Sequence, residues 1–456
     1  MDLLLKNGYV VDSASGFEGK ADILIHDNRI REVGEDISAP EAQTVDCAGL
    51  TVIPGICDMH VHFRDPGQTH KEDIITGGNA AAAGGVTAVA CMPNTNPTID
   101  NAETVHYILE KAKEAKTRVY PVGSITKGLG GAEMCDFEEL HKAGCVAVSD
   151  DGRPVKNARI MAEAMVKAHY AGMKVISHCE DLDIVNGGIM NYGEVSKELG
   201  VKGIHRLSED IITEREITLA ADLEVPIHIA HVSTAQSMQN IRTAARFGTM
   251  VTCETAPHYF MLTDELLRSR DADYRMNPPL RTAADVQAIT EGVIDGTIDC
   301  IITDHAPHAP EEKADFEKAP NGVVGLETSL AATLTALYHT GKISLQRLVT
   351  LMCVNPRRIL SIPGGSLRYR GYMHFRPERG VGSRPGKASL EVEEHLLQGN
   401  DPQGQGKIYS TGRKNSLYRR HRLKNVEKVT KVTFSPSICP ARTSWRLCRQ
   451  PAHLCR

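Results

Sequence analysis

The sequence lacks the features of membrane and secreted proteins. No uncharged apolar run reaches the roughly 18 residues that a transmembrane helix needs, and residues 1–6 lead into Asn7-Gly8 instead of an apolar stretch with a cleavage site. The twelve cysteines are scattered and never form a Cys-x-x-Cys pair, which argues against a disulfide framework or a structural zinc knuckle. We therefore expect a soluble, cytoplasmic protein without membrane contact.

A glycine-rich phosphate loop is missing as well. No Gly-x-Gly-x-x-Gly follows an early strand, which argues against a doubly wound nucleotide-binding sheet. Short strand-like runs fill residues 1–50, and eight apolar runs then alternate with helix-like segments such as residues 101–116 and 233–247. The apolar runs cover residues 51–62, 86–93, 119–125, 145–150, 174–179, 226–232, 250–254 and 300–305. The pattern predicts an α/β fold, with a small β unit at residues 1–50 and a (β/α)8 TIM-type barrel at residues 51–361.

Histidines and aspartates stand at the ends of five of these runs. His60 and His62 share one face of the first run, because successive side chains of a strand point to opposite faces. The C-terminal ends of all barrel strands meet at one rim, so residues far apart in sequence converge there. Nitrogen and carboxylate ligands of this kind suit zinc. The strand-end residues are His60, His62, Asp150, Asp151, His178, His231, Asp304 and His305.

Longer motifs surround these positions. They are Phe63-Arg64-Asp65-Pro66-Gly67, Met92-Pro93-Asn94-Thr95-Asn96-Pro97, Ser149-Asp150-Asp151-Gly152, His178-Cys179-Glu180-Asp181, Ala230-His231-Val232-Ser233-Thr234, Met276-Asn277-Pro278-Pro279-Leu280-Arg281 and Asp304-His305-Ala306-Pro307-His308. Together they resemble the dihydroorotase family of cyclic amidohydrolases, and the resemblance extends from the N-terminus to about Leu367. It implies the reversible cyclisation of N-carbamoyl-L-aspartate to L-dihydroorotate in pyrimidine biosynthesis.

The resemblance also implies two zinc ions per chain. It places one on His60, His62 and Asp304 and the other on His178 and His231, with Asp151 shared between them. Many amidohydrolases bridge their metals with a carbamylated lysine at the end of strand four. Residues 145–151 contain no lysine, so Asp151 takes that place, which argues against a hydantoinase or dihydropyrimidinase.

Roles for further residues follow from the same resemblance. Asp304 is expected to accept a proton from the attacking water and to deliver it to the leaving ring nitrogen. Arg64 is expected to bind the substrate α-carboxylate, since a guanidinium offers a planar fork of donors, and Asn94 and His308 are expected to add contacts. The remaining positions that resemble the ring-binding residues of the family are Asn277, Asn321 and Gly322.

Two other functions stay open at this point. One is hydrolysis of a cyclic amide of the hydantoinase or dihydropyrimidinase kind. The other is a non-catalytic barrel that serves as an assembly partner of aspartate transcarbamoylase, although such a barrel is expected to lack the ligands found here. We expect a small-molecule substrate and no nucleic acid, while a homo-oligomer and a transcarbamoylase complex both stay open.

The tail departs from the rest of the chain. From Arg368 onward, 19 basic residues stand against 6 acidic ones, a net charge of +13 that leaves −18 for the first 367 residues. Residues 368–377 have no period-two pattern, yet a back-translation of them encodes, in another frame, Asp-Ile-Ala-Asp-Ile-Cys-Ile-Phe-Asp-Pro, which resembles the family's last strand. We therefore predict a frameshift near Arg368. Residues 362–456 would be a poorly ordered remnant of the β unit, and their charge would be a by-product, not a nucleic-acid site.

Overall fold

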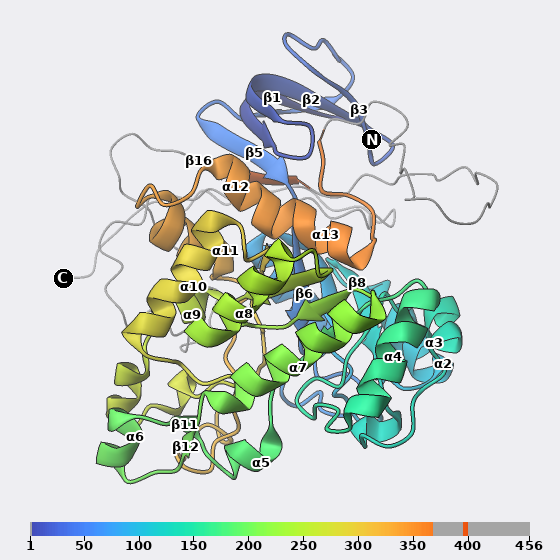
Figure 1. Cartoon of the computed structure of the whole chain (residues 1–456). Helices are drawn as coiled ribbons and strands as arrows, with labels where there is room; N and C mark the ends of the chain where they lie inside the picture. The colour runs from blue at the N-terminus through green and yellow to red at the C-terminus, as the bar shows by residue number, and fades with distance from the viewer. Residues whose placement is uncertain (1, 368–394, 400–456) are drawn as a thin grey trace.

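A computed structural model describes residues 2–367 and 395–399 of the chain (Figure 1). A small sheet lies at one end of the molecule, and a barrel wrapped by helices makes up the rest. The opposite end carries an excursion whose elements are α5 (Leu182–Val185), β11 (Met190–Asn191), α6 (Glu194–Leu199) and β12 (Gly203–Ile204). The first barrel strand leads away from the small sheet, so the carboxyl ends of the barrel strands face this far end.

The small sheet contains six strands in the described residues. Five follow the order β16-β5-β1-β2-β3, and β4 pairs with β1. Their bounds are β1 Leu3–Asp12, β2 Phe17–His26, β3 Arg29–Gly34, β4 Gln43–Asp46, β5 Leu50–Pro54 and β16 His395–Gly399. Leu5, Val10 and Ile23 form its core together with Leu367, so the chain returns to this sheet after the barrel. The backbone N–H of Leu367 fixes that return by donating to Asp12 Oδ2 at 2.9 Å.

The apolar run expected as one barrel strand over residues 51–62 is two strands. β5 belongs to the small sheet, where Thr51 pairs with Tyr9, and β6 (Ile56–Val61) is the first barrel strand. The boundary between the two units therefore lies at Pro54–Gly55 and not after residue 50. Both strands are buried along nearly their whole length, so no change of hydrophobic period marks the break.

The eight predicted barrel strands are confirmed. They form one parallel sheet in chain order, and an N–H···O bond from His62 N to the carbonyl oxygen of His305 (2.8 Å) joins the first strand to the last. After β6 the strands are β7 Val86–Cys91, β8 Arg118–Gly123, β9 Ala147–Val148, β10 Val175–Ser177, β13 Ile227–Ile229, β14 Val251–Thr255 and β15 Cys300–Ile301. This is the (β/α)8 architecture that the alternation of runs indicated.

Helices follow the strands and cover the barrel. The two predicted helices begin with side-chain caps: Asn101 accepts from Thr104 N at α2, and Thr234 accepts from Ser237 N at α8. The helices are α1 Ile74–Gly84, α2 Ala102–Ala112, α3 Phe137–Ala143, α4 Ala158–Tyr170, α7 Leu207–Leu223, α8 Ala235–Arg246, α9 Pro257–Met261, α10 Ala283–Asp295, α11 Ser329–Thr333, α12 Leu345–Val349 and α13 Asn355–Leu360. None of the helices in the described residues has the length and hydropathy to cross a bilayer.

The predictions about the tail fall mostly outside the described residues. This applies to the frameshift near Arg368 and to the disorder expected after it, because residues 368–394 and 400–456 are not described. The exception is β16, which pairs antiparallel with β5 from His395↔Pro54 to Gly399↔Leu50.

Candidate metal centre and substrate pocket

Six histidine and aspartate side chains converge at the carboxyl ends of the barrel strands. His60 lies in β6 and His62 just after it, and the other four follow strands β9, β10, β13 and β15. All six are buried, with exposed fractions between 0% and 6%. The set contains every predicted metal ligand: His60, His62, Asp151, His178, His231 and Asp304.

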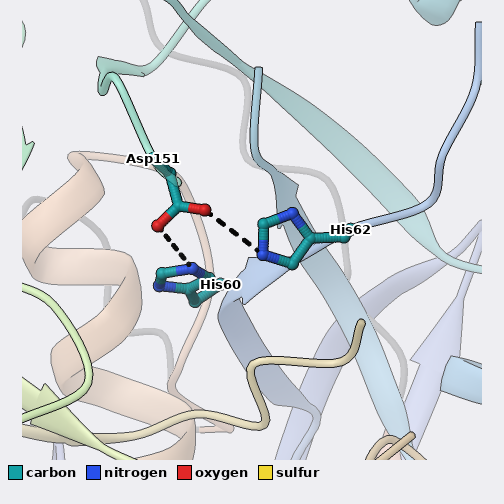
Figure 2. Close-up of side chains that lie close together, drawn as sticks. All are labelled: His60, His62 and Asp151. Atoms are coloured by element: carbon teal, nitrogen blue, oxygen red, sulfur yellow. Dashed lines mark ion pairs between the residues drawn. The ribbon is translucent and has the colours of Figure 1, made fainter. Parts of the chain in front are cut away.

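Asp151 stands at the centre of this cluster. Its Oδ2 lies 3.4 Å from His62 Nε2, and its Oδ1 lies 3.5 Å from His60 Nε2. Figure 2 draws these two ion pairs as dashed lines. The same Oδ1 lies 3.3 Å from His178 Nδ1 and 3.6 Å from His231 Nε2. His60, His62 and Asp151 form one group able to hold a metal ion, and Asp151, His178 and His231 form a second. The carboxylate of Asp151 therefore belongs to both groups.

The neighbouring Asp150 points away from the cluster. Its Oδ1 accepts backbone N–H bonds from Ile125 (2.8 Å) and Thr126 (3.0 Å), so it braces the loop after β8. Adjacent residues at a strand end face opposite sides, and only Asp151 faces the centre.

The buried carboxylates and imidazoles of the cluster shift one another's pKa values. Burial alone would raise the pKa of Asp151, but the neighbouring imidazoles of His178, His231 and His60 hold it well below its usual range. Burial would lower the pKa of His178, but Asp151 and Glu180 outweigh it and raise the pKa to about 10. Without metal, the imidazoles of His60 and His178, whose pKa values are raised, therefore balance the charge of the buried carboxylates.

Asp304 closes the cluster on the β15 side. Its Oδ1 lies 3.2 Å from His62 Nε2 and 3.7 Å from His60 Nε2. Burial would raise its pKa, but the hydrogen bond from His62 and the charge of His60 lower it to about 2. Its backbone φ is +48°, a left-handed conformation that a non-glycine residue holds only when the surrounding structure imposes it.

Outer hydrogen bonds fix which ring nitrogen of each histidine faces the centre. His60 Nδ1 donates to Glu254 Oε1 at 2.6 Å, and His62 Nδ1 donates to Asn94 Oδ1 at 2.8 Å, so both Nε2 atoms point inward. Partners of this kind orient metal-binding histidines in many proteins. Asn94, predicted to contact substrate, thus orients the imidazole of His62 with its side-chain oxygen. Glu254 was not predicted, although it ends the apolar run of residues 250–254.

Several buried polar atoms of the cluster have no hydrogen-bond partner among the described residues. They include His60 Nε2 and Asp151 Oδ1, both aimed at the centre. An unsatisfied buried polar atom costs about 1–3 kcal/mol, so a cluster of them calls for an explanation. A divalent cation between these atoms would satisfy them, and imidazole nitrogens with carboxylate oxygens form a donor set that zinc accepts. The residues present therefore fit a bound metal ion.

Arg64 lies beside the cluster with most of its donors unused. The side chain is buried, its Nε donates to the carbonyl oxygen of Pro307 (3.3 Å), and no oxygen acceptor of the described residues bonds its Nη groups. Burial lowers the pKa of the guanidinium below its usual value, and the carboxylates of Asp304 and Asp151 act in the opposite direction. A buried guanidinium with free donors is suited to an anionic ligand.

His308 lies next to Arg64, within a group of cations. Its Nε2 is 2.9 Å from the carbonyl oxygen of Asn321, and its Nδ1 is 3.3 Å from Lys71 Nζ. Burial, followed by the charge of Arg64, lowers the pKa of His308 to about 3, so the ring is neutral at physiological pH.

The loop that carries Asn321 and Gly322 packs against the end of β15. The Asn321 side chain accepts from Arg275 Nη2 at 3.2 Å, so its amide oxygen is already engaged within the protein. Gly322 has φ +145°, and a Cβ there would stand 2.5 Å from the carbonyl oxygen of Ala306, so only glycine allows this approach. Lys313 Nζ clamps the loop by donating to the carbonyl oxygens of Pro320 and Gly322, both at 3.0 Å.

Asn277 lies across the centre, on the side of His178. Its Nδ2 is 3.5 Å from His178 Nε2, and its Oδ1 is buried without a partner in the described residues. Four residues further on, Arg281 ties this segment to the loop after β13, with Nε donating to Ser233 Oγ (3.0 Å) and Nη2 to Glu209 Oε2 (3.3 Å). The segments that carry Asn277 and His231 are therefore held in one buried network.

Comparisons with known proteins agree with this geometry. A family model described as "Dihydro-orotase-like" matches residues 49–237. A protein of Geobacter sp. (strain M21) named dihydroorotase is 52% identical over 371 residues, which cover 81% of this chain and 87% of that protein. One from Acetivibrio thermocellus with the same name is 48% identical over 367 residues, covering 80% and 86% of the two chains.

Solved structures share the fold. The L-hydantoinase (dihydropyrimidinase) of Arthrobacter aurescens has a TM-score of 0.72 and 26% identity, with 80% of this chain and 84% of that chain covered. The dihydropyrimidinase of Brevibacillus agri NCHU1002 also has a TM-score of 0.72, at 22% identity, with 87% and 86% covered. The second likeness concerns the fold alone. Because identity near 50% extends over four fifths of the sequence, this chain belongs to the dihydroorotase family.

Proposed function

We propose that this protein catalyses the reversible cyclisation of N-carbamoyl-L-aspartate to L-dihydroorotate. The observation that carries the proposal is the pairing of a shared-carboxylate histidine cluster with the buried, largely unbonded guanidinium of Arg64. The cluster suits activation of water and of an amide carbonyl. The guanidinium suits a substrate that carries a carboxylate beside the ring amide, which hydantoins and dihydropyrimidines lack.

Two zinc ions fit the donor set of the cluster. His60, His62 and Asp304 would hold one, His178 and His231 the other, and Asp151 would contribute an oxygen to each. When bound, zinc lowers the pKa of water from 15.7 to roughly 7 and polarises carbonyl oxygens. Glu254 and Asn94 keep the Nε2 atoms of His60 and His62 turned toward the centre of the cluster, where they would be available to a metal ion.

Asp304 is suited to move the proton. Its pKa of about 2 leaves the carboxylate ionised at neutral pH, so it is ready to accept a proton from the attacking water. It then delivers that proton to the ring nitrogen as the amide bond breaks, and it takes the reverse part in ring closure. The positive φ of Asp304 holds the carboxylate against His62 throughout.

The α-carboxylate is proposed to bind the Nη groups of Arg64. Asn94 Oδ1 is engaged by His62, which leaves its Nδ2 as the donor available to the ligand. His308 contributes as a neutral ring at the edge of the same pocket. On the ring side, Asn277 offers a buried unpaired amide oxygen to an N–H of the substrate, and the backbone of Asn321 and Gly322 lines the remaining edge.

The alternative is a hydrolase of the hydantoinase or dihydropyrimidinase kind, which the structural neighbours favour. The aspartate at the end of β9 and the buried Arg64 favour dihydroorotase instead. A silent barrel partner of aspartate transcarbamoylase is disfavoured because five of the predicted ligands form groups able to hold a metal ion and Asp304 lies beside His60 and His62. The proposal also includes a small-molecule substrate, a cytoplasmic location and no nucleic-acid partner. Hydrodynamic measurements would test for a homo-oligomer and for a complex with aspartate transcarbamoylase.

One assay separates these functions. Purified protein is tested on L-dihydroorotate, hydantoin and dihydrouracil, before and after chelation and after zinc is restored, with metal content measured per chain. We expect dihydroorotate hydrolysis that is lost with chelator, returns with zinc and coincides with two ions per chain. Preference for either carboxylate-free ring would support the alternative, and no turnover with metal bound would support the silent barrel.

A further inference from the structure

Lys71 occupies an unusual place for a lysine. It lies in the loop between β6 and α1, and its side chain is only 13% exposed. Its Nζ lies 3.3 Å from His308 Nδ1 and 3.3 Å from Glu312 Oε1. Glu312 in turn accepts the backbone N–H of Ala309 at 2.9 Å, so Lys71 joins the loop after β6 to the loop after β15.

These contacts decide where the proton of His308 resides. An ammonium group can only donate, so His308 Nδ1 must accept from Lys71 and the ring proton must lie on Nε2. The contact on the other side agrees, because the carbonyl oxygen of Asn321, 2.9 Å from Nε2, can only accept. The opposite tautomer would place two protons between Nδ1 and Lys71 and two lone pairs between Nε2 and Asn321.

The tautomer has a consequence for Arg64. Arg64 Nη2 lies 3.5 Å from His308 Nε2, and two donors cannot bond each other, so in the Nε2–H tautomer this contact is not a hydrogen bond. With a proton on Nδ1 instead, the bare Nε2 would accept from Nη2 and draw the guanidinium toward the ring. Glu312 would stabilise that tautomer, because its carboxylate oxygen Oε2 lies 3.6 Å from Nδ1.

We propose that Lys71 is a positioning residue: it neutralises Glu312 and keeps the proton of His308 on Nε2, so that Arg64 stays free to bind the substrate carboxylate. The inference rests on the proposed function, since it assumes a carboxylate on Arg64. Lys71 acts through His308 and Arg64 and does not touch the reacting atoms.

The test compares Lys71→Met with the wild-type enzyme in its zinc-loaded form. Loss of one charge-assisted contact supports a rise in KM for dihydroorotate of about tenfold, with kcat and zinc content nearly unchanged. Lys71→Arg, which keeps a cation that can only donate, should recover most of the affinity. Lys142→Met, at a lysine whose side chain is 76% exposed on α3, is the matched control and should leave KM unchanged.

A second substitution separates tautomer control from a direct charge effect on the substrate. In Lys71→Met/Glu312→Gln the carboxylate that would pull the proton onto Nδ1 is gone, so KM should return toward the wild-type value. A double variant as weak as Lys71→Met would mean that Lys71 attracts the substrate itself, and an unchanged KM in Lys71→Met would also overturn the inference. An inactive wild-type enzyme with zinc bound would instead count against the proposed function.

Discussion

Replacing Asp304 by asparagine isolates the proton transfer assigned to this carboxylate. The new side chain has the same size and keeps an oxygen beside His62 Nε2, which lies 3.2 Å from Oδ1. The backbone φ of +48° is tolerated by asparagine better than by most other non-glycine residues, so the fold around the site should persist. What disappears is a negative charge and a proton acceptor whose pKa is about 2.

The expected loss follows from that acceptor. A positioned general base contributes about 10² to 10⁴ in rate, equivalent to about 2.7 to 5.4 kcal/mol of transition-state stabilisation. We expect kcat to fall by this factor for both dihydroorotate hydrolysis and N-carbamoyl-L-aspartate cyclisation, measured together with zinc content. Asp183→Asn, at a side chain that is 84% exposed, serves as the control. Near-normal turnover of Asp304→Asn with metal retained would refute the role.

Three further outcomes are expected. Arg64→Met should weaken dihydroorotate binding by roughly 10- to 100-fold while sparing a carboxylate-free ring, because a hydrogen bond to a charged group contributes about 1.5–3 kcal/mol; equal losses on dihydroorotate and dihydrouracil would make Arg64 structural. Burial would raise the pKa of Glu254, but the charge of His60 outweighs it and lowers the pKa from 4.5 to about 2. The thermal midpoint of the metal-free protein should therefore fall as the pH is lowered from 4.5 to 2. Glu254→Gln should make the midpoint less dependent on pH in this range. Resequencing the gene should reveal a frameshift near Arg368, whereas an uninterrupted reading frame together with a well-packed tail would contradict it.

The barrel and the convergence of its candidate metal ligands were predictable because both depend on local patterns. Apolar runs mark buried strands, and a parallel barrel brings their carboxyl ends to one rim whatever the sequence separation. The strand pattern alone therefore places His60 and Asp304 at the same rim. The apolar run of residues 51–62 was predicted as one strand, but it forms β5 and β6. Both strands are buried, so hydrophobicity alone could not show that they belong to different sheets.

The supporting residues were not predictable in the same way. Glu254 bonds His60 across 194 residues, and this contact depends on the relative register of β14 and β6, which no local pattern encodes. Lys71 lies in an irregular loop whose sequence has no period, and its importance follows only from what surrounds it. Asn321 resembles a ring-binding position, yet its side chain is turned toward Arg275. Side-chain partners are set by tertiary packing, which the sequence specifies only through the complete fold.

The aspartate at the end of β9 bears on how the enzyme matures. A carbamylated lysine forms only when an amine combines with dissolved carbon dioxide, so the assembly of a centre built on one depends on bicarbonate as well as on metal. Asp151 carries its carboxylate as soon as the chain is translated, and the buried histidines around it keep that group ionised. Reactivation of the metal-free protein should therefore proceed at the same rate in degassed buffer as in buffer saturated with carbon dioxide.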